Sequence, residues 1–308
     1  MSETVLSETV LSEDGLSTLL RQLRFRATVF FRSEYCGSWA VDTSGSRQVP
    51  FHMVCQGEGW LHSSEDSPQR MMAGQLVMFP QDRPHVLANS ENEPKEEDIN
   101  CAEPGGAQGD ATRLVCGYFE FDQRAAGPLL ASLPDTMIVD LGQTRSGALR
   151  ELVNLWINES RELRLGGDLA VDLLAELVFL EMLRAEVNAG RIGGLVGALS
   201  DDRLGPVLHL IHAEPGLPHT AQDLADRVGM SESAFTKRFK DKIGQTVGSY
   251  LRQWRMQLAA RALRETERSM TDIAESVGYD SEVAFRKAFS AYFEIAPGKY
   301  RRQAFNQN

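Results

Sequence analysis

The apolar positions of the chain follow two different periods, one before residue 140 and one after it. Between Ala27 and Phe121, aromatic and β-branched residues come in short runs that are separated by Gly, Pro, Ser and Asp. Short runs with turn-forming residues between them predict an antiparallel β sandwich or barrel. The clearest runs are residues 27–32, 38–42, 51–62, 75–80 and 114–121.

After Asp140 the apolar residues recur at the spacing of an α-helix and predict two helices, separated by Gly166 and Gly167. The second helix is apolar over more than one narrow stripe, which favours burial both against its own domain and against a second copy of the chain. A helix that is covered entirely by its own domain is the alternative. The periodic residues are Leu149, Leu152, Val153, Trp156, Leu169, Leu173, Leu174, Leu177, Val178, Leu180 and Leu183.

From Arg203 onward the pattern is helical throughout, and one helix-turn-helix pattern occurs twice. The two copies are 49 residues apart up to the turn and 50 residues apart from Phe235 and Phe285 onward, so a single inserted residue relates them. The first copy comprises Leu224, Ala225, Val228, Gly229, Met230, Ser231, Phe235, Phe239 and Ile243, and the second comprises Ile273, Ala274, Val277, Gly278, Tyr279, Asp280, Phe285, Phe289 and Phe293.

Each copy supplies what two tightly crossed helices need. A small residue permits the close crossing, a glycine four positions later can adopt a positive φ, and a polar side chain caps the second helix. Two phenylalanines at i and i+4 then hold that helix on the core. These residues are Ala225, Gly229, Ser231, Phe235 and Phe239 in the first copy, and Ala274, Gly278, Ser281 or Asp280, Phe285 and Phe289 in the second.

The outer face of each second helix is the expected DNA-contacting surface. A helix of this diameter fits the major groove, where Lys and Arg reach guanine edges or phosphates and Val or Thr contacts a thymine methyl. A solvated charged face is the alternative for any single residue, but two copies in register favour DNA binding. The candidate residues are Glu232, Ser233, Thr236, Lys237 and Lys240 in the first copy and Glu282, Val283, Arg286 and Lys287 in the second.

The segment between the copies, residues 250–265, is expected to be a connecting helix. Leu251, Trp254, Leu258 and Ala262 face one way, and four arginines (Arg252, Arg255, Arg261 and Arg264) face largely the other. A rigid connector would place the two DNA-contacting helices in successive major grooves about 34 Å apart.

The formal net charge of −11 argues at first against binding to DNA. The charge is unevenly distributed, because residues 203–308 hold 16 Lys and Arg against 12 Asp and Glu, a net charge of +4. Phosphate attraction depends on positive charge within about 8–10 Å, so this part of the chain can bind DNA while the protein stays acidic.

The segment from Leu208 to Arg302 resembles the DNA-binding domain of AraC/XylS-type transcription regulators. The resemblance is carried by TAQDLADRVGMSESAFTKRFKDKIGQTVGSYLRQWRMQLAARAL and DIAESVGYDSEVAFRKAFSAYFEIAPGKYR. It implies double-stranded promoter DNA as a partner, RNA polymerase as a second partner, and transcriptional activation. It also implies base contacts from Ser233, Thr236 and Lys237 and from the second-copy residues above. Glu294 stands where the family usually has Gly, so the final turn is expected to differ slightly.

The first 140 residues are similar to the cupin-type sensor domains of some members of that family. GSWAVD at 37–42, FHMVCQGEGWL at 51–61 and AGQLVMFPQDRPHVLAN at 73–89 carry the similarity. It implies a pocket for a small-molecule effector, to which we assign His52, His85 and Trp60.

Cupins often hold a metal ion, for which three or four converging ligands are needed. His52 and His85 are candidates, with His62, Cys55 or Glu58 as further ones, but the usual cupin HxH run followed by Glu is missing from the sequence. We therefore expect no metal, no cofactor and no catalytic residues. A metal-dependent cupin enzyme joined to a DNA-binding domain stays open as an alternative.

Four cysteines, Cys36, Cys55, Cys101 and Cys116, are scattered without CxxC spacing. Their distribution argues against a zinc ribbon and against a secreted disulfide framework. Small core residues or free thiols are the simplest interpretation, and a redox-sensing pair is the alternative.

The expected fold class is therefore multidomain α+β: a cupin-like antiparallel β barrel or sandwich followed by dimerisation helices, and an all-α domain with two helix-turn-helix motifs. The expected boundaries are a disordered tail at 1–13, a sensor and dimerisation domain at 14–188, a glycine-rich linker at 189–202 and a DNA-binding domain at 203–308. A short amphipathic segment at 14–23 opens the sensor domain, and residues 89–110 are expected to be a mobile loop.

The sequence shows neither a run of about 18 apolar residues nor the pattern of a signal peptide, so a soluble cytoplasmic protein without membrane partners is expected. The predicted function is that of a homodimeric, sequence-specific DNA-binding transcription regulator, an activator, that responds to a small-molecule or stress signal and is not an enzyme.

Overall fold

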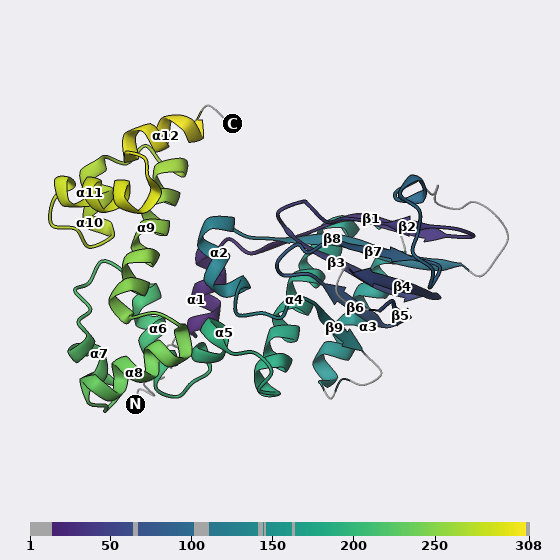
Figure 1. The fold of residues 1–308 in the computed structure, drawn as a ribbon, viewed down its shortest axis with the longest axis horizontal. Helices are drawn as coiled ribbons and strands as arrows, with labels where there is room; N and C mark the ends of the chain where they lie inside the picture. The colour runs from purple at the N-terminus through teal and green to yellow at the C-terminus, as the bar shows by residue number, and fades with distance from the viewer. Residues whose placement is uncertain are drawn as a thin grey trace, which may run out of the picture. The chain divides into compact units, whose positions relative to one another are not determined.

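The computed structural model describes residues 14–63, 67–101, 111–140, 144, 146–161 and 164–305. The described chain divides into two compact units (Figure 1). One unit runs from Leu23 to Gly197, and the other combines the described residues before Leu23 with those from Ala198 onward. The predicted tail at 1–13 and residues 102–110 of the predicted loop lie outside the described residues.

The unit from Leu23 to Gly197 is built on two antiparallel sheets, as the short apolar runs predicted. The five-stranded sheet has the order β1 (Arg26–Tyr35), β8 (Thr112–Glu120), β3 (Val49–Gln56), β6 (Gln75–Met78), β9 (Met137–Asp140). The four-stranded sheet has the order β2 (Ala40–Val41), β7 (His85–Ala88), β4 (Glu58–Ser63), β5 (Gln69–Met72). A one-turn 3-10 helix, η1, covers Glu96–Asp98.

The predicted run at 51–62 forms two strands rather than one. Gly57 separates β3 from β4 with a φ of +75°, and a Cβ there would lie 2.8 Å from the carbonyl oxygen of Ala111. Side chains that alternate between the faces fill the space between the sheets. That core includes Tyr35, Trp39, Val54, Leu61, Met71, Val77, Phe79, Leu87, Leu114 and Cys116.

Two helices follow the strands, as predicted: α3 (Gly147–Arg161) and α4 (Gly167–Asn188). Gly166, with a φ of +77°, lies at the N-terminal cap of α4. The indole ring of Trp156 on α3 packs on Phe51 of β3, with ring centroids 5.6 Å apart. Seven consecutive residues of β3 are buried, because its side chains meet the sheet-to-sheet core on one face and these helices on the other.

The predicted linker at 189–202 is more ordered than a flexible connection. It contains the helix α5 (Gly194–Leu199), which includes two of its four glycines, and Ile192, Leu195, Val196 and Ala198 are buried. A further helix, α2 (Gln123–Leu130), lies between β8 and β9 in the chain.

The second unit is helical. It comprises α1 (Gly15–Gln22), α6 (Leu204–Ala213), α7 (Ala221–Arg227), α8 (Glu232–Ile243), α9 (Val247–Glu265), α10 (Met270–Ser276), α11 (Glu282–Phe293) and α12 (Pro297–Phe305). The predicted amphipathic segment at 14–23 forms α1, but it packs on α6 instead of on the strands that follow it. Arg261 of α9 holds it there by donating to the backbone carbonyl of Gln22 at 2.5 Å.

Candidate nucleic-acid interface and sensor domain

The two helix-turn-helix motifs have the predicted geometry and match each other. Gly229 and Gly278 have φ values of +65° and +75°. After each glycine the chain turns back in the same way, because Met230 N–H donates to Ala225 O at 3.0 Å and Tyr279 N–H donates to Ala274 O at 2.9 Å. Ala225 and Ala274 are buried at the helix crossings, as the small side chain at these positions predicted.

The second helix of each motif, α8 or α11, is the recognition helix. Ser231 caps α8 by accepting from Ala234 N–H at 3.4 Å, and Ser281 caps α11 by accepting from Ala284 N–H at 3.2 Å. Of the two caps expected for the second copy, the structure therefore selects Ser281 over Asp280. The four phenylalanines predicted to hold these helices on the core are all fully buried: Phe235, Phe239, Phe285 and Phe289.

An arginine secures the turn of each motif. Arg203 donates through Nη1 to the carbonyl of Val228 at 2.6 Å, and Arg255 donates through Nη1 to the carbonyl of Gly278 at 3.4 Å. Arg255 also donates to the carbonyls of Pro215 and Leu217 at 2.7 Å each. At Gly278 a Cβ would lie 2.5 Å from the backbone oxygen of Gly216 and 2.7 Å from this guanidinium, so only glycine fits there.

The four arginines of α9, which the sequence places largely opposite its apolar residues, do not form a solvated face. Only Arg252 among the four is exposed. Arg255, Arg261 and Arg264 are half-buried and donate to groups of neighbouring elements, Arg264 to the hydroxyl of Tyr300 at 2.8 Å. These side chains therefore connect α9 to the rest of the helical unit, which makes it a stiff connector between the motifs.

Asp201 links the start of α6 to the first recognition helix. Its carboxylate accepts from the backbone N–H groups of Arg203 and Leu204 and from the guanidinium of Arg238 on α8, the last at 2.5 Å. Burial opposes ionisation, but these hydrogen bonds outweigh it and hold the pKa of Asp201 below its usual value. The ionised carboxylate thus helps to fix the orientation of α8.

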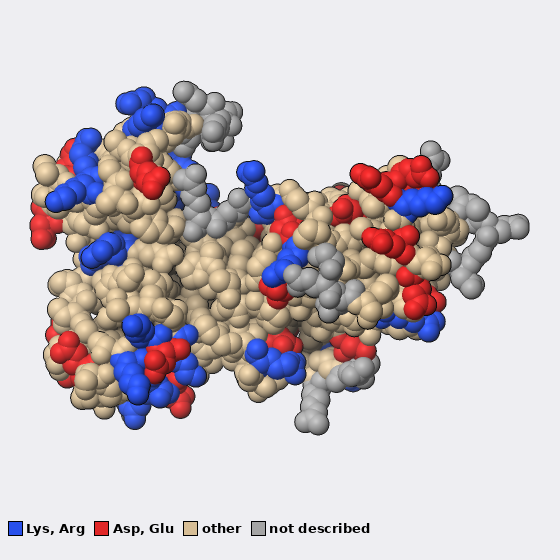
Figure 2. Space-filling view, in the orientation of Figure 1, with Lys and Arg blue, Asp and Glu red and all other residues tan. Residues whose placement is uncertain are grey.

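The predicted DNA-contacting residues lie on the free faces of the two recognition helices. Ser233, Lys237 and Lys240 on α8 are exposed, as are Val283, Arg286 and Lys287 on α11. Val283 is 78% exposed, so its methyl groups are accessible to a thymine methyl in a major groove. Figure 2 shows Lys and Arg side chains gathered over α8.

Two predicted contact residues are already engaged within their own motif. The hydroxyl of Thr236 donates to the carbonyl of Glu232 at 2.8 Å, so its methyl group is the part available to a base. Glu282 uses both carboxylate oxygens: Oε1 accepts from Arg286 Nε at 2.6 Å, and Oε2 accepts from the hydroxyl of Thr271 at 3.0 Å. The bond to Arg286, followed by that to Thr271, lowers the pKa of Glu282.

The final turns of the two motifs have similar geometry, although Glu294 stands in the second where Gly244 stands in the first. Gly244 ends α8 with a φ of +84°, and Glu294 ends α11 with a φ of +59°. Gly244 N–H donates to Lys240 O at 2.8 Å, and Glu294 N–H donates to Ser290 O at 2.9 Å. The glutamate adopts the left-handed conformation that glycine would adopt more easily.

In the sheet unit, the structure brings together the two histidines assigned to effector binding. His52 from β3 and His85 from β7 meet between the sheets, with their Nε2 atoms 3.0 Å apart. The hydroxyl of Thr43 lies 3.1 Å from His52 Nε2 and 3.2 Å from His85 Nε2. Both rings are buried, which lowers the pKa of each. The imidazoles are therefore neutral near pH 7 and serve as hydrogen-bonding groups.

Trp60, the third predicted effector residue, is not part of this pair. It lies opposite Ala88 in the pairing of β4 with β7, and side chains alternate along a strand. Ala88 points away from the face that carries His85 and Leu87, so Trp60 projects from the other face of the sheet. The sequence established the strand but not this register.

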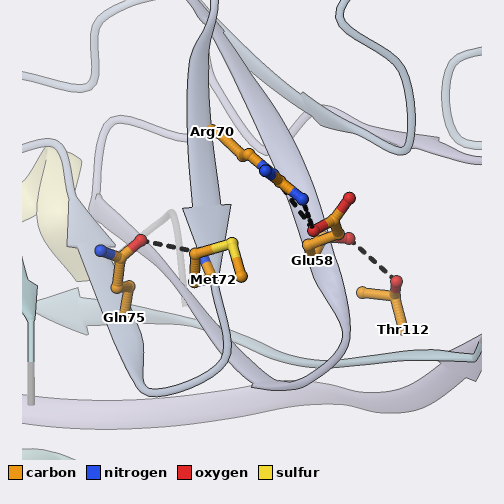
Figure 3. A network of polar contacts seen from close by, with 5 residues as sticks. All are labelled: Glu58, Arg70, Met72, Gln75 and Thr112. Atoms are coloured by element: carbon orange, nitrogen blue, oxygen red, sulfur yellow. Dashed lines mark hydrogen bonds and ion pairs between the residues drawn. The ribbon is translucent and has the colours of Figure 1, made fainter. Parts of the chain in front are cut away.

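The further metal candidates are dispersed as well. Figure 3 shows Glu58 paired with Arg70 across the β4–β5 hairpin, where Thr112 donates to the carbonyl of Glu58 at 2.9 Å. His62 lies 2.9 Å from the carbonyl of Ser90 through Nε2. Among the described residues no group of three or more His, Cys, Asp and Glu could hold a metal ion.

The cysteines are free thiols in different surroundings. Burial raises the pKa of Cys55 to about 11 and raises that of Cys116 as well. The Sγ of Cys116 lies 3.0 Å from His52 Nδ1, inside the polar cluster between the sheets. Because the thiolate is the reactive form, these two thiols are poorly suited to redox sensing, whereas Cys36 is half-buried and Cys101 is exposed.

A β sandwich that is joined to a helical unit with two matched recognition helices defines a class of protein, the two-domain DNA-binding regulators. The cupin family model matches residues 14–188, and a helix-turn-helix domain model matches residues 224–303. The cupin match includes α1, which the structure groups with the helical unit. None of the helices in the described residues is long and apolar enough to span a bilayer.

Similar proteins extend over nearly the whole chain. A putative AraC-like transcription regulator of Streptomyces lividans is 30% identical over 298 residues, which cover 94% of this chain and 98% of the relative. The RCS-specific HTH-type transcriptional activator RclR of Escherichia coli is 29% identical, with the same coverage. The solved DNA-binding domain of AdpA in complex with a target DNA is 26% identical and covers 35% of this chain and 97% of its own, with a TM-score of 0.33.

The chain belongs to the AraC-like transcription regulators, and its N-terminal part belongs to the cupin family. It is a DNA-binding transcription regulator.

Proposed function

We propose that this regulator binds promoter DNA as a homodimer through α8 and α11, and that its cupin domain (residues 14–188) senses a small-molecule or stress signal. The observation that carries the proposal is the pair of recognition helices, equivalent in turn, cap and anchoring phenylalanines, on one stiff connector. Their exposed residues are the polar, basic and small apolar types that recognise base edges in the major groove.

The leucines of α4 support the homodimer. Leu169, Leu173 and Leu177 follow one another at intervals of four residues and are 64%, 47% and 46% exposed. Val171, Ala175 and Val178 are buried against the sheet unit, so α4 has a second, unpartnered apolar face. A second copy of the same stripe would cover it, and a dimer would present two helical units to paired half-sites.

Activation through RNA polymerase is supported by the relatives, one of which carries the name of a transcriptional activator. A signal that changes the arrangement of the two units would change the fraction of molecules able to occupy both half-sites. The dispersal of Glu58 and His62 away from His52 and His85 supports sensing over metal-dependent catalysis in the cupin domain.

The test is a gel-shift titration of promoter fragments with Lys237→Ala and Lys287→Ala. Each variant should bind more weakly, and a lysine that contacts a phosphate should lower the slope of log affinity against log salt by about one. Lys95→Ala is the matched control, because Lys95 is an exposed lysine of the sheet unit. Wild-type affinity in both recognition-helix variants would contradict the assignment of α8 and α11.

A further inference from the structure

Besides α9, which runs from the first helix-turn-helix motif to the second (Figure 1), a direct contact joins the two motifs. It lies between the turn of the second motif and the lead-in loop, residues 214–220, which connects α6 to the first motif. A Cβ on Gly278 would lie 2.5 Å from the carbonyl oxygen of Gly216, and a Cβ on Gly216 would lie 3.1 Å from that of Ser276. A glycine on each side therefore lets the two backbones meet.

Arg255, near the middle of α9, is bonded to both sides of this contact. Its Nε and Nη2 donate to the carbonyls of Pro215 and Leu217 in the lead-in loop, at 2.7 Å each. Its Nη1 donates to the carbonyl of Gly278 in the turn of the second motif, at 3.4 Å. Because all three acceptors belong to the backbone, the guanidinium fixes the course of the chain on both sides. The planar fork of arginine suits such acceptors, and the ammonium of lysine lacks that geometry.

The lead-in loop is also held by hydrogen bonds of its own, so its position is transmitted to the first motif. Leu217 N–H donates to the carbonyl of Glu214 at 3.1 Å. Three residues after Leu217, Thr220 caps α7 by accepting from Asp223 N–H at 3.1 Å. The bonds from Arg255 to this loop therefore act within a few residues of the first helix of the first motif.

We propose that Arg255 is a positioning residue for DNA recognition. It locks the two motifs together, so that α8 and α11 accept only one separation between the base pairs that they contact. Arg203 differs from it, because its carbonyl acceptor, Val228, belongs to the first motif alone. This inference rests on the proposed DNA contacts of α8 and α11, and it adds a limit on the spacing of the DNA sites that the protein can bind.

A fixed separation has a measurable consequence on B-form DNA. Each inserted base pair moves one contacted segment relative to the other by about 3.4 Å along the helix axis and by about 34–36° around it. Two motifs on a flexible connection could follow that movement. Two locked motifs cannot, so one recognition helix loses base contacts, and the affinity falls by about tenfold or more.

The test measures how strongly the full chain binds a promoter fragment and the same fragment with one base pair inserted, in each half-site, between the segments that α8 and α11 contact. Footprinting of the wild type locates these segments. The insertion should weaken wild-type binding by about tenfold or more, and this penalty should fall to about threefold or less in Arg255→Ala. Arg255→Lys retains the charge and the aliphatic stem, so it decides the question if Arg255→Ala fails to fold. It should also show a reduced penalty, because its ammonium cannot hold both sides of the contact.

Arg203→Ala is the matched control, because it removes an arginine that bonds to one motif only, and it should keep the full insertion penalty. The slope of log affinity against log salt should be the same in Arg255→Ala as in the wild type. A slope lower by about one would make Arg255 a phosphate contact and overturn the proposal.

The outcomes separate this inference from the proposed function. A wild-type insertion penalty in Arg255→Ala and Arg255→Lys would overturn the positioning role of Arg255 and leave the regulator assignment in place. The proposed function fails instead if the wild type binds no promoter fragment selectively, whatever the variants do.

Discussion

The carboxylate of Asp172 on α4 accepts a hydrogen bond from the backbone N–H of Val29 on β1, at 2.8 Å. One turn further along, Glu176 accepts from the N–H of Ala27 at 3.3 Å. Because β1 is at the edge of its sheet, these N–H groups have no neighbouring strand to pair with. The carboxylates of α4 thus accept hydrogen bonds from backbone N–H groups of an edge strand, which could otherwise pair with a strand of another chain.

Asp172→Ala should lower the free energy of unfolding by about 1–2 kcal/mol, because it leaves a backbone N–H of β1 without its charged acceptor. Urea unfolding measures the change. Asp168→Ala is the control on the same helix: its side chain is 87% exposed in an ion pair with Arg32. Such a pair contributes about 0.5 kcal/mol or less, and a larger loss in Asp168→Ala than in Asp172→Ala would contradict the role of Asp172.

The leucine stripe of α4 predicts the oligomeric state. The double variant Leu169→Glu and Leu173→Glu should convert a dimer into a monomer in sedimentation equilibrium, because four carboxylates would face one another across the interface. Leu217→Glu, at an exposed leucine of the helical unit, should leave the dimer intact. A dimer that persists in the double variant would place the interface elsewhere.

The Glu282–Arg286 pair predicts how the second motif discriminates bases. Arg286→Ala should reduce discrimination at one base pair by about 1–3 kcal/mol. Glu282→Ala should reduce it at the same base pair, because Glu282 holds the guanidinium through Oε1. Binding-site selection on single and double variants measures this effect. If Glu282 acts only by holding Arg286, the double variant should lose no more discrimination than Arg286→Ala alone. A loss in the double variant that equals the sum of the two single losses would instead show that Glu282 contacts a base itself.

Glu294 and Gly244 end α11 and α8 with a positive φ, and substitutions at these two positions should have opposite effects on stability. Glu294→Gly should raise the free energy of unfolding by about 0.5–1 kcal/mol, because glycine adopts the observed positive φ without the steric cost of a Cβ. Gly244→Ala should lower it by about 1 kcal/mol at the equivalent position of α8. Thermal unfolding of the two variants tests the pair, and stabilisation by both would show that φ is not the determining factor.

Burial of His212 predicts acid sensitivity of the helical unit. Burial lowers the pKa of this imidazole from 6.5 to about 3. The unfolded chain therefore binds a proton that the folded chain excludes, so the stability is fully present above pH 6.5 and falls as the pH decreases. The loss is at most about 1.4 kcal/mol per pH unit for one group.

His212→Asn removes the titrating group, so the urea concentration at the unfolding midpoint should depend less on pH between pH 6.5 and about pH 4.5. The absolute stability should also fall, because the ring lies 2.7 Å from the hydroxyl of Tyr250 through Nε2. An unchanged slope in His212→Asn would assign the acid sensitivity to other groups.

The sequence was sufficient for the helix-turn-helix motifs. A glycine with positive φ, a serine cap and phenylalanines at i and i+4 all act within about a dozen residues, so the linear pattern contains their geometry. The alternation of short apolar runs also sufficed for the antiparallel sandwich, although β5, β7 and β9 were too short or too polar to stand out.

Contacts between distant segments needed the folded chain. Strand register places His52 beside His85 and turns Trp60 to the other face, because a shift of one residue reverses every side chain of a strand. In the same way, the pairing of Arg261 with Gln22 and the packing of Ser132 on Gly194 join residues that no local period relates. Local patterns encode the recognition helices, whereas long-range packing decides which side chains surround a ligand.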